Sequence, residues 1–159
     1  MTGGYNYHSS HSRRAYLFDY ETANFTRIDD MIDGRYGHTC NVVRSEVRGS
    51  ELVVAGGGLN RNSVDILSFG SMEWREGPAL PKPIAWAQSV AYGDSFLMMG
   101  GGDGGGVFYD TIYEYDHVNE GWIERPEKLH ETKYDFTAVM LDSKDVNCGG
   151  GAGNNATLF

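Results

Sequence analysis

Short runs of apolar residues alternate with polar turns along the whole chain of 159 residues. Two of these runs, Leu52–Ala55 and Phe96–Met99, lead directly into clusters of glycine. The alternation typical of half-exposed strands occurs at Ala15–Asp19, Val64–Ser68 and Ile112–Asp116. No segment keeps a helical period beyond two turns. The pattern therefore predicts an all-β fold built from short strands.

Further strands are predicted after loops that contain proline or acidic residues. They are His38–Val43, Trp86–Ala91 and Tyr134–Leu141. A tight turn at Tyr92–Ser95 would return the second of these strands to the glycine-bound strand that follows it. Together with a short strand at each bulky aromatic, every unit would contain four strands. Such a unit is typical of a four-stranded up-and-down sheet that buries its faces against neighbouring copies.

Glycine clusters and bulky aromatic residues recur at nearly constant spacing. The clusters begin at positions 3, 56, 100 and 149, which are separated by 53, 44 and 49 residues. Phe25, Trp74 and Trp122 lie between them, separated by 49 and 48 residues. This period predicts repeats of about 3–55, 56–99 and 100–148, with 149–159 as the start of a further unit or a loop.

One unit carries a motif that resembles the kelch repeat. It has a double glycine at Gly101 and Gly102, a Tyr115-Asp116 pair, and Trp122 six residues after the aspartate. The similarity covers essentially the whole chain and implies kelch-type β-propeller blades of four antiparallel strands, three blade-equivalents in all, related to the galactose oxidase fold. The residues that match the motif are Gly3, Gly4, Gly56, Gly57, Gly100, Gly101, Gly102, Gly149, Gly150, Asp19, Tyr115, Asp116, Phe25, Trp74 and Trp122.

We expect structural roles for these motif residues. Glycine lets the backbone approach a neighbour closely, and the aspartate side chain caps a turn. The tryptophan would cover the gap between adjacent blades. The copies depart from the motif at Phe25 and at Leu67-Ser68. The arginine that the family places before its first strand is present as Arg35, and the sequence aligns Pro83 and Thr132 with it in the other units.

Three blades would not close a ring, because propellers usually have four to eight. The predicted strands begin with the third strand of one blade and end after the second strand of another. Two hypotheses follow from this arrangement. The chain is a portion of a longer propeller, or two copies pair as a homodimer that closes a six-bladed ring.

The composition excludes several classes of partner. The chain has 13 basic and 22 acidic residues, a net charge of −9, which argues against nucleic acid and against a polybasic membrane surface. No signal peptide is visible, so the cytoplasm is the default expectation and the compartment stays open. Cys40 and Cys148 are expected to be buried free thiols without zinc spacing. Sequons occur at Asn24 and Asn155, where about one is expected by chance, so glycosylation stays open.

No catalytic constellation stands out, so we predict no catalytic residue, no metal and no cofactor. His8 and His11 lie in one loop, which we interpret as solvated, and His38 is expected to be structural. The glycine-rich stretch 100–106 lacks the following helix that a phosphate site needs. The alternative is a fragment of a kelch-propeller enzyme, such as a galactose-oxidase-like copper oxidase or a sugar epimerase, with its catalytic residues in other blades.

The resemblance favours a protein–protein interaction module that acts as a scaffold or substrate-recognition platform. In kelch propellers, two sets of loops open on one face. Here those loops are Tyr5–Arg14, Leu59–Ser63 and Asp103–Asp110 after the glycine strands, and Asp30–Gly37, Pro78–Ala85 and Pro126–Lys133 between units. The predicted partner-binding residues in and beside them are Tyr5, Tyr7, Arg13, Arg14, Arg35, Tyr36, Asn60, Arg61, Trp86, Tyr109 and Tyr134. An adaptor of a ubiquitin ligase or an actin-linked scaffold is a third hypothesis.

Overall fold

The computed structural model describes residues 1–5, 11–58, 62–141 and 157–158. Within these residues all regular structure is β, and no helix occurs. Two sheets have four strands, namely β3 (Thr39–Ser45), β4 (Gly49–Ala55), β5 (Val64–Ser68) and β6 (Trp74–Glu76), and then β7 (Gln88–Tyr92), β8 (Ser95–Met99), β9 (Thr111–Asp116) and β10 (Gly121–Lys128). Two sheets have two strands, β1 (Ala15–Asp19) with β2 (Asn24–Ile28), and β11 (Val139–Met140) with β12 (Thr157–Leu158).

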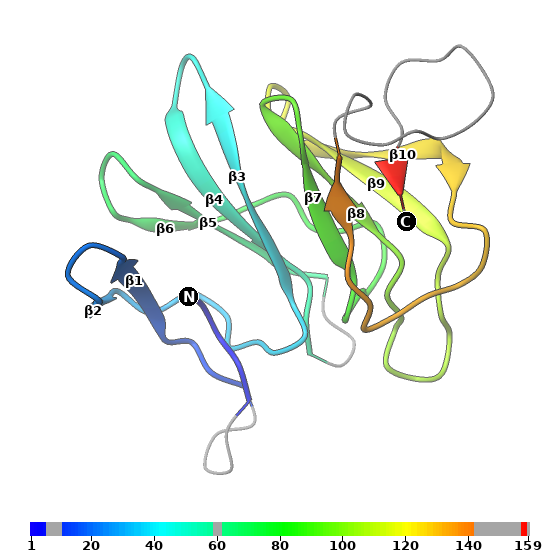
Figure 1. Ribbon diagram of the computed structural model, residues 1–159, viewed down its shortest axis with the longest axis horizontal. Helices are drawn as coiled ribbons and strands as arrows, with labels where there is room; N and C mark the ends of the chain where they lie inside the picture. The colour runs from blue at the N-terminus through cyan, green and yellow to red at the C-terminus, as the bar shows by residue number, and fades with distance from the viewer. Residues whose placement is uncertain (6–10, 59–61, 142–156, 159) are drawn as a thin grey trace.

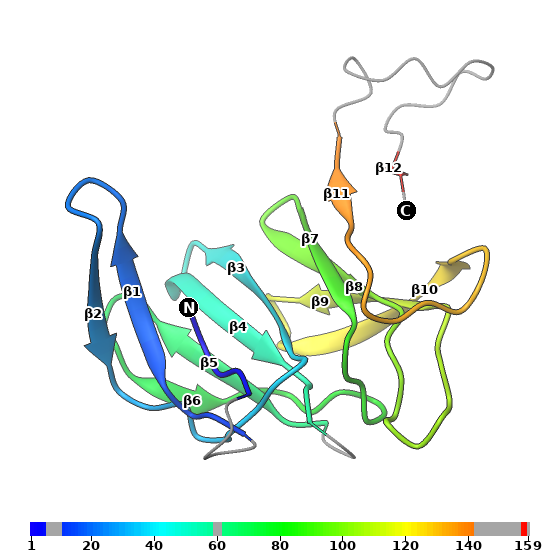
Figure 2. The same ribbon diagram turned by 60° about the horizontal axis from the view of Figure 1, so that its bottom comes forward.

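All strand pairs are antiparallel, and strands that follow one another in the sequence lie side by side in each sheet. The sheets follow one another as an open fan, with β1–β2 at one end and β7–β10 toward the other (Figures 1 and 2). In each four-stranded sheet a glycine cluster separates the second strand from the third in the sequence, because β4 and β8 end immediately before one. The sequence repeat therefore spans the second half of one sheet and the first half of the next.

The predicted strands Ala15–Asp19 and Val64–Ser68 are confirmed residue for residue. The predicted strand Tyr134–Leu141 is wrong over most of its length, since only Val139–Met140 is extended and paired. Asp135 adopts a left-handed backbone with φ of 51°, and its N–H donates to the carbonyl of Trp86. This contact with the preceding connection between sheets prevents the strand from starting earlier.

The main core lies between the two four-stranded sheets. Val53 and Ile66 from the first sheet meet Phe96, Met98 and Tyr115 from the second, and all five are at most 1% exposed. Burying each such side chain contributes roughly 1.5–3 kcal/mol. A second cluster on the other face of β7–β10 is covered by the segment that leads into β11. Its members are Val90, Leu97, Met99, Ile112 and Leu129, with Phe136, Ala138 and Met140 packed against them.

The expectation that Cys40 is buried is wrong. Its neighbour Thr39 faces the second sheet, where its hydroxyl donates to the Ser89 hydroxyl at 2.6 Å. Successive residues of a strand face opposite sides, so Cys40 points away from that sheet and is exposed. The other cysteine, Cys148, lies outside the described residues.

The hairpins β1–β2 and β9–β10 are built in the same way. The carboxylate of Asp19 accepts hydrogen bonds from the N–H groups of Glu21 and Thr22, and that of Asp116 accepts from Val118 and Asn119. Both carboxylates have a pKa below the usual range of aspartate, mainly because hydrogen bonds from the turn favour the charged form. A left-handed residue occupies the equivalent turn position in these two hairpins and in β5–β6. These residues are Ala23, Glu120 and Met72.

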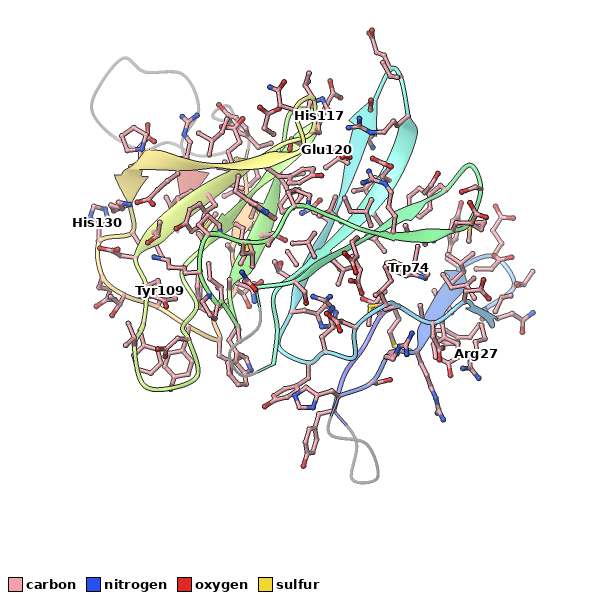
Figure 3. The ribbon with its side chains drawn as sticks, turned by 180° about the vertical axis from the view of Figure 1, so that it is seen from behind. Arg27, Trp74, Tyr109, His117, Glu120 and His130 are labelled. Carbon is pink, nitrogen blue, oxygen red and sulfur yellow. The ribbon has the colours of Figure 1, made fainter. Side chains whose placement is uncertain are left out.

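The two tryptophans of the repeat link neighbouring sheets. The indole Nε1 of Trp74, on β6, donates to the carbonyl of Asp29 at 2.9 Å (Figure 3 labels Trp74). The indole Nε1 of Trp122, on β10, donates to the carbonyl of Pro78 at 2.9 Å. Each acceptor belongs to the connection that leaves the preceding sheet. Phe25 holds the equivalent position on β2 and is 59% exposed.

Candidate partner-binding face

The loops after β4 and β8 begin at glycines that contact the next connection between sheets. The N–H of Gly57 donates to the carbonyl of Ile84 at 2.9 Å, and the N–H of Gly101 donates to that of Lys133 at 2.7 Å. A Cβ on Gly100, whose φ is +67°, would lie 2.6 Å from the Lys133 carbonyl oxygen. Only glycine fits such a position. These contacts bring the loop after β8 next to the segment between β10 and β11, at the lower edge of the fan in Figure 1.

Four rings from three segments meet at the first two connections. The Tyr5 and Tyr36 ring centroids are 5.7 Å apart in an edge-to-face arrangement, and those of Tyr36 and Trp86 are 5.6 Å apart. The His11 ring also packs on Tyr36, with ring centroids 4.8 Å apart. The structure therefore brings together three of the residues selected from the sequence, which lie up to 81 positions apart in the chain.

A second aromatic pair lies at the last connection. Phe108 and Tyr134 stack with ring centroids 4.4 Å apart and planes inclined by 11°, and both rings are exposed. Tyr134 is the structural equivalent of Tyr36. The residues before them, Arg35 and Lys133, both accept a hydrogen bond from the N–H of a repeat glycine. At each site an aromatic residue from a loop, Tyr5 or Phe108, packs on a tyrosine in a connection between sheets, Tyr36 or Tyr134.

Trp86, whose ring belongs to the first group, is linked by main-chain hydrogen bonds to residues next to both connection tyrosines, Tyr36 and Tyr134. Its N–H donates to the carbonyl of Gly37 at 2.7 Å, and its carbonyl accepts from the N–H of Asp135 at 3.0 Å. Its backbone is left-handed, with φ of 54°. We call Tyr5, Tyr36, Trp86, Phe108 and Tyr134 the aromatic band. It crosses successive sheet connections on the loop side of the fan.

Tyr109 is only half exposed, because a lysine covers its ring. The Lys82 Nζ lies 3.9 Å from the Tyr109 ring centroid and 3.1 Å from the hydroxyl oxygen of Thr111. Burial, followed by the negative charge of Asp103, raises the pKa of Tyr109. The ring also packs against the main core. Tyr109 (labelled in Figure 3) therefore supports the face rather than presenting a free ring to a partner.

Arg35 is not on the surface, so its selection as a partner-binding residue is corrected. Its side chain is 0% exposed. It forms an ion pair with Asp65 at 2.9 Å and donates to the carbonyls of Gly56 at 2.8 Å and Ser63 at 2.9 Å. Burial raises the pKa of Asp65, and the charge of Arg35 opposes that rise. Arg35 thus ties the first connection to β5.

The alignment of Arg35 with Pro83 and Thr132 is also corrected, by one residue. The carbonyls of Arg35, Ile84 and Lys133 each accept from the second glycine of a cluster, namely Gly4, Gly57 and Gly101. Ile84 and Lys133 therefore hold the position of Arg35 in the later units. A hydrogen-bond partner defines an equivalent position more directly than residue type does.

Of the other arginines in the predicted set, the two that the structure describes, Arg13 and Arg14, are exposed. The Nε of Arg13 donates to the carbonyl of Met31 at 2.6 Å, and the N–H of Arg14 donates to the Ser12 hydroxyl at 3.2 Å. Other predicted residues lie outside the described part of the chain, so no contact is assigned to them. They are the partner-binding residues Tyr7, Asn60 and Arg61, the glycines Gly149 and Gly150, and also His8 and Asn155.

His38 lies in the backbone framework beneath the band, between Gly3 and Gly57. Its Nε2 is 3.0 Å from the Thr2 hydroxyl, and its Nδ1 is buried without a hydrogen-bond partner. Burial, followed by the charge of Arg35, lowers the pKa of His38 to about 4. The imidazole is therefore neutral at pH 7 and serves packing rather than charge.

Phe108 and Lys82 were not selected from the sequence. Phe108 lies inside the predicted loop Asp103–Asp110. It and Val107 are the bulky apolar residues of that loop, among glycines and polar groups. An aromatic residue in a glycine-rich loop was thus a usable signal. Lys82 gave no such signal, because its contact with Tyr109 joins the β6–β7 connection to the β8–β9 loop, between residues 27 positions apart.

The sequence also gave no sign of a charged cluster at the opposite side of the fan. Glu51, on β4, accepts ion pairs from Arg48 at 3.4 Å and from Arg75 at 3.0 Å. Both arginines also pair with Glu120 of the β9–β10 turn, which is labelled in Figure 3. This cluster links the two four-stranded sheets. The two arginines and two glutamates of this cluster pair with one another.

The described residues show no metal-binding constellation, since no three His, Cys, Asp or Glu side chains lie close enough to hold one ion. In the same part of the chain no helix has the length and apolar character needed to cross a membrane.

The chain matches no protein-family model, and no curated protein sequence is significantly similar to it.

Proposed function

We propose that this chain is part of a kelch-type β-propeller that recognises other proteins through the aromatic band. Three structural regularities support the propeller assignment. The four-stranded sheets keep their strands in chain order, the tryptophans donate to equivalent carbonyls, and the glycines contact equivalent connections. A repeat unit that buries its faces only against its neighbours is the general property of this architecture.

The observation that carries the recognition role is the aromatic band itself. Phe108 and Tyr134 expose 43% and 52% of their surface, and Tyr5 exposes 68%. Large aromatic rings supply much of the binding energy at protein interfaces, and tyrosine and tryptophan are enriched at hot spots. Exposed rings grouped on one side of a soluble sheet array are a surface of this kind.

The rings are held before any partner arrives. Main-chain hydrogen bonds fix Trp86 on both sides, and each exposed tyrosine or phenylalanine of the aromatic band packs on another ring. A preorganised surface loses less conformational entropy on binding than a flexible loop does. Peptide or protein segments with apolar side chains are the partner class that fits such rings.

The test is selection of binders from a random peptide library on the purified chain. Enriched peptides would then be titrated against wild type, Tyr134→Ser and Phe108→Ser by fluorescence anisotropy. We expect each substitution to weaken binding at least tenfold, or about 1.4 kcal/mol. Val47→Ser is the matched control, because Val47 is 91% exposed on the β3–β4 hairpin, away from the band.

Circular dichroism of each variant would establish that the fold is retained. Peptides that bind all variants as well as wild type would contradict the proposed face. Peptides that lose binding only in Val47→Ser would move the recognition surface to the opposite side of the fan.

A further inference from the structure

The contact between neighbouring sheets occurs twice within the chain, with the same parts each time. Trp74 and Trp122 each donate to a carbonyl of the preceding connection, that of Asp29 or Pro78. The hydrophobic residue two positions after each acceptor, Met31 or Leu80, is at most 2% exposed. One side of the contact is thus an aromatic ring on the last strand of a sheet, β6 or β10. The other side is the connection that leaves the preceding sheet.

The first hairpin presents the aromatic side of this contact without a cover. Phe25 is 59% exposed and Phe18 is 52% exposed, with their ring centroids 4.7 Å apart. The residues equivalent to Phe18 are Leu67 and Tyr115, and each is 1% exposed. In the other two hairpins, therefore, the same position is fully covered.

The last connection presents the other side, also without a cover. Glu127 lies 49 residues after Pro78, and the segment Pro126–Lys128 is exposed. The next residue, Leu129, is buried like its equivalent Leu80. The N–H of Leu129 donates to Asp110, as that of Leu80 donates to Asn62. Pro126–Lys128 end β10, and Leu129 after them makes the same contact as its equivalent in a connection that already holds a tryptophan.

We propose that two copies of this chain associate head to tail, with Pro126–Lys128 of each copy covering Phe18 and Phe25 of the other. A second copy is the occupant that the structure favours, because the chain itself carries both halves of a contact it already makes twice. The inference is independent of recognition through the aromatic band, which lies on the loop side.

The strand count agrees with closure of a two-copy ring. β1–β2 and β11–β12 are two-stranded sheets at opposite ends of the chain, and together they have the four strands of a complete sheet. Two copies would then form six four-stranded sheets, within the usual range of closed rings of this architecture. A head-to-tail contact gives a closed particle rather than an open filament when its rotation closes.

The test is sedimentation equilibrium of the full chain over a range of concentrations. We expect a particle of twice the chain mass of 17.6 kDa. Phe25→Asp should give a monomer with an unchanged circular dichroism spectrum. Phe25→Trp should lower the dimer dissociation constant about tenfold, since an indole N–H could donate to the Glu127 carbonyl as the other tryptophans do to theirs. Val47→Asp, also exposed but outside the contact, should stay dimeric.

A mixing experiment distinguishes the head-to-tail arrangement from a symmetric patch. Phe25→Asp and Pro126→Asp should each be monomeric alone, but their mixture retains one intact contact and should associate. A wild type that is monomeric at every concentration would overturn the proposal, as would a dimer that survives both substitutions. Mass that grows without limit would overturn ring closure. Peptide binding by monomeric Phe25→Asp would show that recognition by the aromatic band does not depend on this contact.

Discussion

The indole nitrogen of Trp122 donates to the carbonyl of Pro78 at 2.9 Å, across the boundary between the two four-stranded sheets. The same indole packs edge to face with Phe96 and Tyr115, at centroid distances of 5.8 and 5.1 Å. One end of the ring is therefore in the core of its own sheet, and the other end is bonded to the preceding one. Sheets linked in this way should unfold together.

Trp122→Phe should remove the hydrogen bond and keep most of the packing. We expect a loss of about 1 kcal/mol in the free energy of unfolding from the bond alone, and about 3 kcal/mol for Trp122→Ala, which also leaves a cavity. Urea denaturation followed by circular dichroism measures both values. Equal losses for the two variants would show that the hydrogen bond, rather than the ring, dominates the contact.

Ser68→Asp should stabilise the protein. Ser68 holds the position of Asp19 and Asp116, whose carboxylates each accept two turn N–H groups. Restoring that cap should add about 0.5–1 kcal/mol to the free energy of unfolding, and Asp116→Ala should subtract a similar amount. The urea midpoints of the two variants should move in opposite directions, and a fall for Ser68→Asp would contradict the equivalence.

Arg35→Met should be strongly destabilising, because it leaves the carboxylate of Asp65 buried without its partner. Asp65 is 1% exposed. We expect a loss of about 3–5 kcal/mol for the single variant and a smaller loss for Arg35→Met with Asp65→Leu. A double-mutant cycle on the free energy of unfolding measures the coupling.

Arg27→Met provides the matched control for that cycle. Arg27 pairs with Asp30 at the same distance of 2.9 Å, but its side chain is 56% exposed. Removing it should leave the free energy of unfolding nearly unchanged, because exposed ion pairs are screened by solvent. Comparable losses for Arg27→Met and Arg35→Met would mean that burial of the Arg35 pair does not matter to stability.

His38 should make the protein less stable in mild acid. Its folded pKa of about 4 lies below its ordinary value of 6.5. Between these values the unfolded chain binds the proton and the folded chain does not, so stability falls as pH is lowered through that window. The contribution lost between pH 7 and pH 5 is about 2 kcal/mol.

His38→Gln isolates this effect, because glutamine can keep a hydrogen bond to Thr2 but does not titrate. The difference in unfolding free energy between pH 7 and pH 5 should shrink by about 2 kcal/mol in the variant. Carboxylates titrate in both proteins and cancel in the comparison. An unchanged pH dependence would place the acid sensitivity elsewhere.

Strand positions were predictable where the local pattern decides them. Ala15–Asp19 and Val64–Ser68 were located exactly as observed because alternation, turn residues and glycine punctuation agree there. The strand after Tyr134 was misplaced, since Asp135 donates its N–H to Trp86 instead of a neighbouring strand. That competing partner is 49 residues away and has no local signature.

The candidate face was only partly predictable. Tyr5, Tyr36 and Trp86 were selected from their residue type and loop position, and the structure brings their rings together. Arg35 was selected on the same grounds and lies in the interior, where Asp65 compensates its charge. Residue type alone does not distinguish the two environments, because the partner that makes burial tolerable comes from another strand.

The sequence by itself determined the repeat, the all-β character and the two-residue alternation of the strands. These properties are local, or they recur at a fixed spacing, and short-range sterics and turn chemistry are enough to specify them. Only the tertiary structure decided which charges are buried, which aromatic rings meet and which faces stay uncovered. Those outcomes depend on contacts between sheets, where each side chain is stabilised or excluded by residues that the chain brings in from about fifty positions away.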